Sequence, residues 1–315
     1  MSERILVAGS GAIGSVVACL LAEAGLEVNV LGRGEHLQAM ARADGGIEIE
    51  GIWGSHRARP AAAFDDPALV GEGYDCILVA CKSFQTGPLV TALGKRPLAA
   101  AGRAISMQNG LGNVEQLAAV FGEERSLAAR VIFGGEIVRP GRVRVTVEAE
   151  PLLIGHPTRA RDEGAEHWAA VLDSAGVPAR ATGNVIAALW GKVFYNAALN
   201  PLGALLGFNY GQLAGSAELR GVMDRVMDEA HAVAKAEGVA LPWPGAADYR
   251  AHFYGKLIPP TVDHRSSMLQ DLERGRPTEI DAICGEVVRR GDAHGIDVSA
   301  NRVLLALVRA RSGAA

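Results

Sequence analysis

The feature that most constrains the fold is a glycine-rich loop near the start of the chain. The loop follows an apolar, strand-like run, Ile5–Ala8, and leads into a helix-like segment, Ala12–Ala24. In a strand–loop–helix unit, glycines at this spacing allow a tight turn, close approach of the backbone to a pyrophosphate, and close packing of helix on strand. We therefore expect a dinucleotide-binding site, rather than a simple turn, at Gly9, Ser10, Gly11, Ala12, Ile13 and Gly14.

Further strand-like runs follow along the first half of the chain and are separated by helix-like segments. They cover Glu27–Leu31, Cys76–Ala80 and Ala104–Met107. Apolar strands that alternate with helices are typical of a parallel sheet covered on both faces. From about Leu127 to Ile154 the pattern changes to that of a hairpin, with Pro140-Gly141 as its turn. The expected fold class is therefore α/β, with a Rossmann-type doubly wound sheet.

After about Gly183 the strand-like pattern ends and helical periodicity takes over. It is found in Ala187–Leu199, Ala217–Glu237, Ser266–Glu273 and Glu279–His294. A chain of 315 residues is too long for one ordinary compact domain, and its apolar content of 49% suffices for two cores. We therefore predict an NADP-binding Rossmann-type domain over residues 1–183 and an all-helical substrate and catalytic domain over residues 184–315.

Charge and composition argue against several other classes of protein. The chain has 31 Lys and Arg against 35 Asp and Glu, a net charge of −4, so we expect no nucleic-acid partner. No apolar stretch approaches the roughly 20 residues of a membrane span. The N-terminal residues lack a signal-peptide pattern, so we expect a cytoplasmic protein. The 4 cysteines and 8 histidines lack metal-ligand spacing, and no G-x-S-x-G nucleophile motif occurs in the sequence.

The end of the second predicted strand bears on the choice of cofactor. NAD-binding enzymes usually place an acidic residue there, where it accepts a hydrogen bond from the ribose 2′-hydroxyl group. This chain instead has Arg33, whose planar, permanently charged guanidinium suits a 2′-phosphate group. We therefore predict NADPH as the cofactor. The alternatives are that Arg33 is a solvated surface residue, or that the nearby Glu35 takes part in the choice.

Two other predicted strands end in polar residues. This matters because ligands of open α/β sheets bind beyond the carboxyl ends of the strands. Lys82 follows one strand and is able to anchor a carboxylate or a cofactor hydroxyl group. Asn109 follows the next, close to Gly110 and Gly112, and is able to hold the nicotinamide ribose or the substrate. An Asn-Gly pair is also common in turns, so structural roles for these residues are equally compatible with the sequence.

The strongest polar pattern of the helical half is a stripe formed by Lys192, Asn196 and Asn200. Their i, i+4, i+8 spacing places all three side chains on one side of a helix whose other residues are apolar or aromatic. A buried polar group without a partner costs about 1–3 kcal/mol, so the stripe requires partners. A polar ligand would supply them, and the alternative is a structural hydrogen-bond network between the domains.

The last candidate residues lie toward the C-terminal end. Thr278 and Asp281 have the spacing of a capping box, which makes Glu279 and Asp281 interpretable as acidic residues of a first helical turn. Ser267 is likewise compatible with an ordinary helix serine. From the local pattern alone, none of these residues requires a catalytic role.

These segments together resemble the ketopantoate reductase (2-dehydropantoate 2-reductase) family over nearly the whole chain. The resemblance implies NADPH-dependent reduction of ketopantoate, a small 2-oxo acid, to pantoate in pantothenate biosynthesis, and it is compatible with a homodimer. Besides the glycine loop, the matching segments are Cys81-Lys82, Gln108–Gly112, Lys192 with Asn196, Asn200–Leu202, Ser267–Asp271 and Thr278–Asp281.

The resemblance also implies roles for individual residues. Lys192 would be the general acid that protonates the new alkoxide, and Glu279 would bind a substrate hydroxyl group and hold the lysine in position. Arg33 would contact the 2′-phosphate group. The residues implied to bind or position the substrate or the nicotinamide are Lys82, Asn109, Asn196, Asn200 and Ser267.

Two positions depart from the family pattern at the end that would recognise the substrate. Gly203 stands where the family commonly has Thr, and Tyr210 stands where a substrate-binding asparagine is expected, with Asn209 adjacent. These departures leave the chemistry unaffected but weaken the assignment of ketopantoate itself. The alternatives are a reductase of another branched 2-oxo acid and a non-enzymatic NADPH-binding sensor. The pair Lys192 and Glu279 argues against the sensor, because a sensor needs no proton donor.

Overall fold

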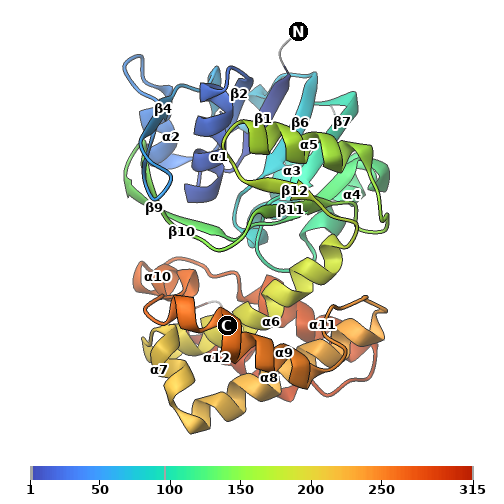
Figure 1. Ribbon diagram of the computed structural model, residues 1–315. Helices are drawn as coiled ribbons and strands as arrows, with labels where there is room; N and C mark the ends of the chain where they lie inside the picture. Colours follow the sequence, from blue (N-terminus) through green and yellow to red (C-terminus); the bar gives the residue numbers. More distant parts are fainter. Residues whose placement is uncertain (1–2, 96, 314–315) are drawn as a thin grey trace. The chain divides into compact units, whose positions relative to one another are not determined.

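The computed structural model describes residues 3–95 and 97–313, which divide into two compact units (Figure 1). The first unit contains the described residues up to Gln108 together with Asn113–Val185. The second unit contains the described residues from Ile186 onward together with the short segment Asn109–Gly112. A loop from the first half of the sequence thus belongs structurally to the second unit.

The first unit is built on a sheet of 8 strands, most of which run parallel. The order across the sheet is β12 (Ala179–Ala181), β11 (Leu152–Gly155), β8 (Ser126–Arg130), β7 (Leu98–Ser106), β6 (Tyr74–Val79), β1 (Arg4–Ala8), β2 (Glu27–Leu31) and β5 (Ala62–Phe64). Among the described strands of this sheet, only β8 and β11 pair antiparallel. The chain passes from β1 to β2 on one side and later returns to β6 on the other. The strand order therefore reverses next to β1, where ligands of such sheets bind.

Helices cover both faces of this sheet (Figure 1). The helical segments of the unit are α1 (Ala12–Glu23), α2 (Gly34–Ala41), η1 (Pro67–Leu69), η2 (Ser83–Gln85), α3 (Thr86–Leu93), α4 (Asn113–Phe121), η3 (Glu123–Arg125) and α5 (Glu163–Ser174). Ile5 and Val7 of β1 pack in one buried cluster with residues of α1 and α5. Leu6 and Ala8 pack in another with residues of α3 and α4. This burial of alternate residues on opposite faces confirms the expected doubly wound α/β fold.

A smaller sheet of 4 strands belongs to the same unit. Its order is β4 (His56–Ala58), β3 (Ile47–Gly51), β10 (Arg142–Glu148) and β9 (Phe133–Arg139). Ile47 and Val143 from this sheet share the buried cluster of α1. β9 and β10 form the expected hairpin, with Pro140-Gly141 as its turn. The hairpin is shorter than predicted, because Leu127 and Ile154 are buried in β8 and β11 of the large sheet.

The second unit is helical, and its described residues include no strand. Its segments are α6 (Val185–Leu206), whose first residue still belongs to the first unit, α7 (Tyr210–Gly215), α8 (Ala217–Ala236), α9 (Ala246–His252), η4 (Phe253–Leu257), η5 (Pro259–Thr261), α10 (Ser267–Glu273), η6 (Asp281–Gly285), α11 (Glu286–Ala293) and α12 (Ser299–Arg311). η4 and η6 are π-helical turns, so the helix predicted from Glu279 begins with an irregular segment. In the part of the chain that the structure describes, no helix has the length and apolar character needed to cross a membrane.

Helix α6 continues through Pro201, which the sequence did not indicate. The predicted helix stops at Leu199, and a proline inside a helix removes a backbone hydrogen bond and costs about 3 kcal/mol. The observed helix extends to Leu206. Ala198, Leu199 and Ala204 on either side of the proline are fully buried. Burial of this apolar surface offsets the local cost, so packing lets the helix continue through the proline, and the helix ends before Gly207, whose φ is 74°.

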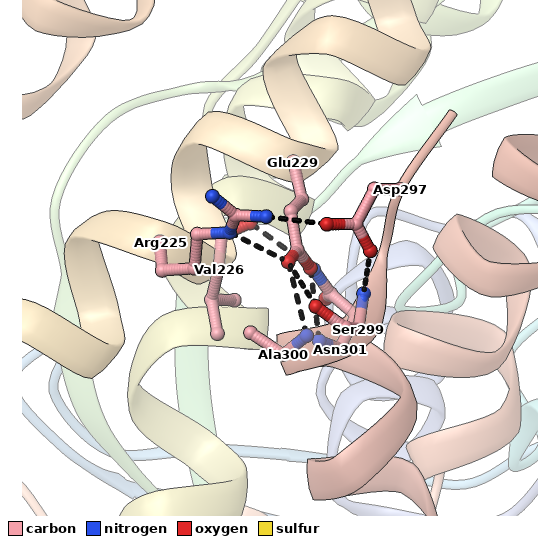
Figure 2. Close-up of polar contacts among 7 residues, drawn as sticks. All are labelled: Arg225, Val226, Glu229, Asp297, Ser299, Ala300 and Asn301. Atoms are coloured by element: carbon pink, nitrogen blue, oxygen red, sulfur yellow. Dashed lines mark hydrogen bonds and ion pairs between the residues drawn. The ribbon is translucent and has the colours of Figure 1, made fainter.

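Figure 2 shows how α12 is anchored to α8. The carboxylate of Glu229, which is 4% exposed, accepts hydrogen bonds from the backbone N–H groups of Ala300 and Asn301, both at 3.0 Å. The Asn301 side chain and Nε of Arg225 also donate to it, at 2.9 and 3.0 Å. The two N–H groups belong to the first turn of α12, where a helix has no carbonyl partner for them. A side chain from another helix therefore caps α12.

Candidate functional site

The glycine loop joins β1 to α1 in the first unit. Gly9 has a φ of 133°, and a Cβ there would overlap the backbone of Ala80 and Cys81, just after β6. A Cβ on Gly14 would overlap the carbonyl oxygen of Gly9, so helix and loop are in close contact. Gly11 differs, because a Cβ there would meet no atom within 4 Å. Gly11 is the N-cap of α1, so this open space lies at a helix N-terminus and fits a pyrophosphate group.

The end of β2 lies against this loop. A Cβ on Gly32 would overlap Oγ of Ser10, so the two segments are in contact. Arg33 follows as the N-cap residue of α2, and its side chain is exposed. Arg33 thus comes directly after the strand end that contacts the glycine loop, and a guanidinium group suits a phosphate group chemically. Glu35 in the first turn of α2 is also exposed and would fit a ribose hydroxyl group instead.

A buried polar network, which the sequence reasoning missed, joins the ends of β6 and β7. Nε2 of Gln108 donates to the carbonyl oxygen of Cys81 at 3.0 Å and to Oγ1 of Thr86. Oγ of Ser106 donates to Oε1 of Gln108 at 3.2 Å. Lys82 lies directly after Cys81 and is partly buried. The available signal was the presence of two polar residues, Ser106 and Gln108, at the end of an apolar strand.

In the second unit, Asn109 lies between Lys192 and Glu279. Nζ of Lys192 donates to Oδ1 of Asn109 at 2.6 Å, and Nδ2 of Asn109 donates to Oε2 of Glu279 at 3.2 Å. Because Oδ1 only accepts and Nδ2 only donates, these two partners fix the orientation of the amide. Glu279 is 7% exposed and Lys192 is partly buried, so both bonds lie largely out of water, where they are stronger. Three residues that are distant in sequence thus form one series of hydrogen bonds.

The backbone around Asn109 is fixed as well. The N–H group of Leu111 donates to the carbonyl oxygen of Ala282 at 2.8 Å. Gly110 has a φ of 83°, and a Cβ there would overlap the backbone of Ala282. Only glycine combines this backbone conformation with such a close approach. The segment that carries Asn109 is therefore held against η6, which begins soon after Glu279.

The two asparagines of the predicted stripe on α6 are buried. Asn196 is 7% exposed and Asn200 is 5% exposed. Tyr210 donates its hydroxyl group to Oδ1 of Asn200 at 2.9 Å. Burial raises the pKa of Tyr210 well above its ordinary value, so the hydroxyl group stays protonated and acts as the donor. Tyr210 stands where the family pattern has an asparagine. It therefore orients Asn200 and does not offer a further amide group.

Two serines lie at the start of α10. Ser266 is buried, whereas Ser267, the predicted site residue, is exposed. Oγ of Ser266 accepts a hydrogen bond from the N–H group of Leu269 at 3.1 Å and so caps the helix. Gly203 faces the same region, where a Cβ would lie 3.2 Å from the carbonyl oxygen of Phe208. A threonine therefore has little room at Gly203 unless the carbonyl group of Phe208 shifts slightly.

The capping box expected from Thr278 and Asp281 is not formed, and that interpretation is wrong. Oγ1 of Thr278 is buried and makes no hydrogen bond within the described part of the chain. Asp281 is exposed and accepts a hydrogen bond from Nε of Arg309 on α12 at 2.9 Å. A distant guanidinium offers this carboxylate a charge-assisted partner that local spacing does not reveal. Glu279 is buried, so it is not a surface acid of a first turn either.

Comparison with known proteins identifies relatives of the whole chain. The model of the ketopantoate reductase PanE/ApbA family matches residues 5–158, and the model of the C-terminal part of the same family matches residues 184–312. The 2-dehydropantoate 2-reductase of Aquifex aeolicus is 35% identical over 99% of this chain and 97% of its own length. The enzyme of the same name from Archaeoglobus fulgidus is 32% identical over 98% of this chain and 97% of its own length.

Solved structures agree with these relatives. A PanE/ApbA family ketopantoate reductase from Ralstonia eutropha JMP134 superposes with a TM-score of 0.86 at 36% identity, with 99% of both chains covered. D-mandelate dehydrogenase, solved with NADH and anilino(oxo)acetate, has a TM-score of 0.88 at 22% identity over 99% of both chains, and so shares the fold. Matching models over both halves and relatives above 30% identity along the whole length place this chain in the ketopantoate reductase family of oxidoreductases.

Proposed function

We propose that this chain is an NADPH-dependent reductase that converts 2-dehydropantoate (ketopantoate) to pantoate, the reaction for which its relatives are named. In this proposal residues 1–183 form the cofactor-binding domain and residues 184–315 bind the substrate and supply the acid. One observation carries it, namely the series of hydrogen bonds through Lys192, Asn109 and Glu279. Reduction of a 2-oxo acid needs a held proton donor, whereas a protein that only binds the cofactor does not.

The first unit supplies the residues proposed to hold NADPH. The open N-terminus of α1 at Gly11 suits the pyrophosphate, and the exposed Arg33 suits the 2′-phosphate group. Lys82 would position the nicotinamide or the substrate. When bound, the nicotinamide ring supplies the hydride. The exposed Glu35 supports NADH as the alternative cofactor, and D-mandelate dehydrogenase, which shares the fold, was solved with NADH.

Lys192 is the proposed general acid. As the carbonyl carbon of the substrate accepts hydride, negative charge develops on the carbonyl oxygen, and an ammonium group aimed at that oxygen stabilises the charge. Nζ of Lys192 then transfers a proton to the oxygen and completes the alcohol. Oδ1 of Asn109 holds Nζ at 2.6 Å before the reaction, so less conformational freedom is lost in the transition state.

Glu279 and the buried amides of α6 are proposed to bind the rest of the substrate. A carboxylate accepts hydrogen bonds, so Glu279 suits a substrate hydroxyl group while it also orients Asn109. Asn196 and Asn200 offer N–H donors that suit the substrate carboxylate. Ser267 would add a hydroxyl contact.

A second candidate function is the reduction of a different branched 2-oxo acid. The observation in its favour is the hydrogen bond from Tyr210 to Oδ1 of Asn200, because it orients the amide of Asn200 so that Nδ2 points away from Tyr210. A substrate group that accepts a hydrogen bond from Nδ2 of Asn200 would then be favoured. The limited room for a threonine at Gly203 changes the same end of the site.

The test is an absorbance assay at the nicotinamide band. The purified chain is given NADPH, and then NADH, with ketopantoate and with a panel of 2-oxo acids that differ in branching and in hydroxyl groups. We expect NADPH to be consumed fastest with ketopantoate. Faster consumption with another 2-oxo acid would favour the second candidate function. Consumption with none of them would contradict both functions and leave a cofactor-binding protein.

A further inference from the structure

His36, on α2, connects three parts of the first unit, of which α1 and the start of α2 adjoin residues proposed to bind the cofactor. Its Nε2 lies 3.0 Å from Oγ of Ser15 on α1. Its Nδ1 lies 3.0 Å from the backbone nitrogen of Gly141, in the turn between β9 and β10. Oγ of Ser15 in turn lies 3.4 Å from the carbonyl oxygen of Ser10 in the glycine loop. One imidazole ring therefore joins the glycine-loop helix, the second helix and the hairpin.

The direction of each of these hydrogen bonds follows from the partners. A backbone N–H group only donates, so Nδ1 of His36 must accept from Gly141 and carry no proton. In a neutral imidazole the other nitrogen then carries the proton, so Nε2 donates to Oγ of Ser15. The hydroxyl proton of Ser15 is left to point at the carbonyl oxygen of Ser10. The series runs in one direction, from the hairpin through His36 to the glycine loop.

Burial supports the neutral form that this series needs. His36 is partly buried, and burial lowers its pKa from the ordinary value of 6.5, while the backbone carbonyl of Arg139 acts in the opposite direction. Ser15 is fully buried, so its hydroxyl group depends on His36 and Ser10 for partners. Near neutral pH the imidazole is therefore uncharged and makes both hydrogen bonds.

The same imidazole lies beside the residues proposed to choose the cofactor. His36 is in the first turn of α2, whose N-cap residue is Arg33. The strand end just before Arg33 is itself in contact with the loop, because a Cβ on Gly32 would overlap Oγ of Ser10. The strand end before α2 is thus in contact with the glycine loop through Ser10, and α2 itself is hydrogen-bonded to α1 through His36 and Ser15.

We propose that His36 is a positioning residue for cofactor selection, which holds Arg33 at a fixed place relative to the glycine loop so that one NADPH molecule meets both. This inference rests on the proposed use of NADPH. The pyrophosphate meets the loop in either cofactor, whereas only NADPH also has a 2′-phosphate group for Arg33. Loss of the tie between α2 and α1 should therefore weaken NADPH binding more than NADH binding.

The test measures dissociation constants of NADPH and NADH by calorimetry, without any 2-oxo acid. For His36→Ala we expect the constant for NADPH to rise roughly tenfold, as loss of two hydrogen bonds allows, and that for NADH to rise less than about threefold. His36→Phe fills the same volume without the bonds and should behave like His36→Ala. Gln38→Ala removes an exposed side chain of the same helix and should leave both constants unchanged.

Two conservative variants separate the bonds from each other and provide a rescue. An asparagine at 36 places an amide near the position of Nδ1 and can accept from Gly141, whereas a glutamine reaches the position of Nε2 and can donate to Ser15. His36→Asn and His36→Gln should each recover part of the NADPH affinity lost in His36→Ala. They also decide the matter if His36→Ala does not fold, since a selective loss of NADPH affinity in either one supports the proposal.

Three results would overturn the inference, and they are distinguishable from failure of the proposed function. A preference for NADPH that stays unchanged in all His36 variants contradicts the positioning role alone. An equal loss of affinity for both cofactors, with unchanged thermal unfolding, shows that His36 supports the glycine loop for either cofactor and does not contribute to the choice between them. A wild-type chain without a preference for NADPH contradicts the role of Arg33 and this inference together, while turnover of a 2-oxo acid would still support a reductase.

Discussion

Nζ of Lys192 lies 2.6 Å from Oδ1 of Asn109, a residue 83 positions earlier in the chain. Asn109 belongs to a short segment that packs with the helical unit although its sequence neighbours lie in the other unit. Nδ2 of Asn109 donates to Glu279, so Oδ1 is the atom of the amide that faces Lys192. The proposed acid is therefore positioned by an amide that itself has only one stable orientation.

The first prediction concerns this amide. Asn109→Ala removes an acceptor of Lys192 and a donor to Glu279, so the ammonium group is held less firmly. Because misplacement of a catalytic group by about 1 Å costs on the order of 10² in rate, we expect kcat to fall by roughly 10–100-fold. Steady-state kinetics with ketopantoate measures this. A kcat within about twofold of wild type would show that the lysine does not depend on Asn109.

The second prediction concerns Tyr210. Tyr210→Phe keeps the buried ring but removes the donor to Oδ1 of Asn200, so the amide can reverse. A neutral hydrogen bond contributes about 0.5–1.5 kcal/mol, so we expect the KM for the 2-oxo acid to rise roughly two- to tenfold with kcat nearly constant. Tyr210→Asn should shift the preference within the panel of 2-oxo acids. An unchanged KM in both variants would separate Tyr210 from substrate recognition.

The third prediction concerns the stability of the helical unit. Glu229→Ala leaves the N–H groups of Ala300 and Asn301 without their acceptor in a buried place. An unsatisfied buried group costs about 1–3 kcal/mol, so we expect the free energy of unfolding to fall by about 2–4 kcal/mol. Arg225→Ala is the control, because it removes an exposed partner and keeps the carboxylate. Chemical denaturation of the two variants should give a much smaller change for Arg225→Ala.

The fourth prediction concerns pH. Burial lowers the pKa of His36 from 6.5, against the smaller opposing effect of the Arg139 carbonyl, so the folded state binds fewer protons than the unfolded state just below pH 6.5. The contribution of neutral His36 to stability is thus complete above pH 6.5 and is lost as the pH falls through the lowered folded value. We expect Tm to fall more steeply between about pH 7.5 and pH 5 for wild type than for His36→Gln.

The control for the pH prediction is Gln38→Ala. Gln38 is an exposed residue of α2 and does not titrate. Its replacement should leave the slope of Tm against pH close to that of wild type. Equal slopes for wild type and both variants would show that His36 does not titrate on unfolding in this range.

Much of the first unit was predictable because its signals are local. The run Glu27–Leu31 coincides with β2, and the glycine loop lies between β1 and α1 as its spacing indicated. Strands that are buried on both faces read as continuous apolar runs, so neighbouring residues carry the signal. The hairpin turn at Pro140-Gly141 was local as well. The segments on either side of the hairpin were not predictable in this way. Leu127 belongs to the large sheet because it pairs with β7, which is more distant in the sequence.

The site was less predictable, because its geometry depends on long-range partners. Helix α6 continues through Pro201 owing to burial by the rest of the unit. Asp281 pairs with Arg309 rather than with Thr278. The hydroxyl group of Tyr210 reaches Asn200 across a turn between two helices. Residue types at these positions indicated polarity and spacing, but neither specifies which distant side chain completes a hydrogen bond.

The most direct test of the whole account is the rate of hydride transfer in Lys192→Ala, measured in single turnovers with NADPH and ketopantoate. Lys235→Ala, which removes an exposed lysine of α8, is the matched control. We predict that Lys192→Ala slows the reaction by roughly 10²–10⁴-fold, that its dissociation constant for NADPH stays near that of wild type, and that Lys235→Ala reacts normally. A Lys192→Ala variant that transfers hydride at the wild-type rate would contradict the account.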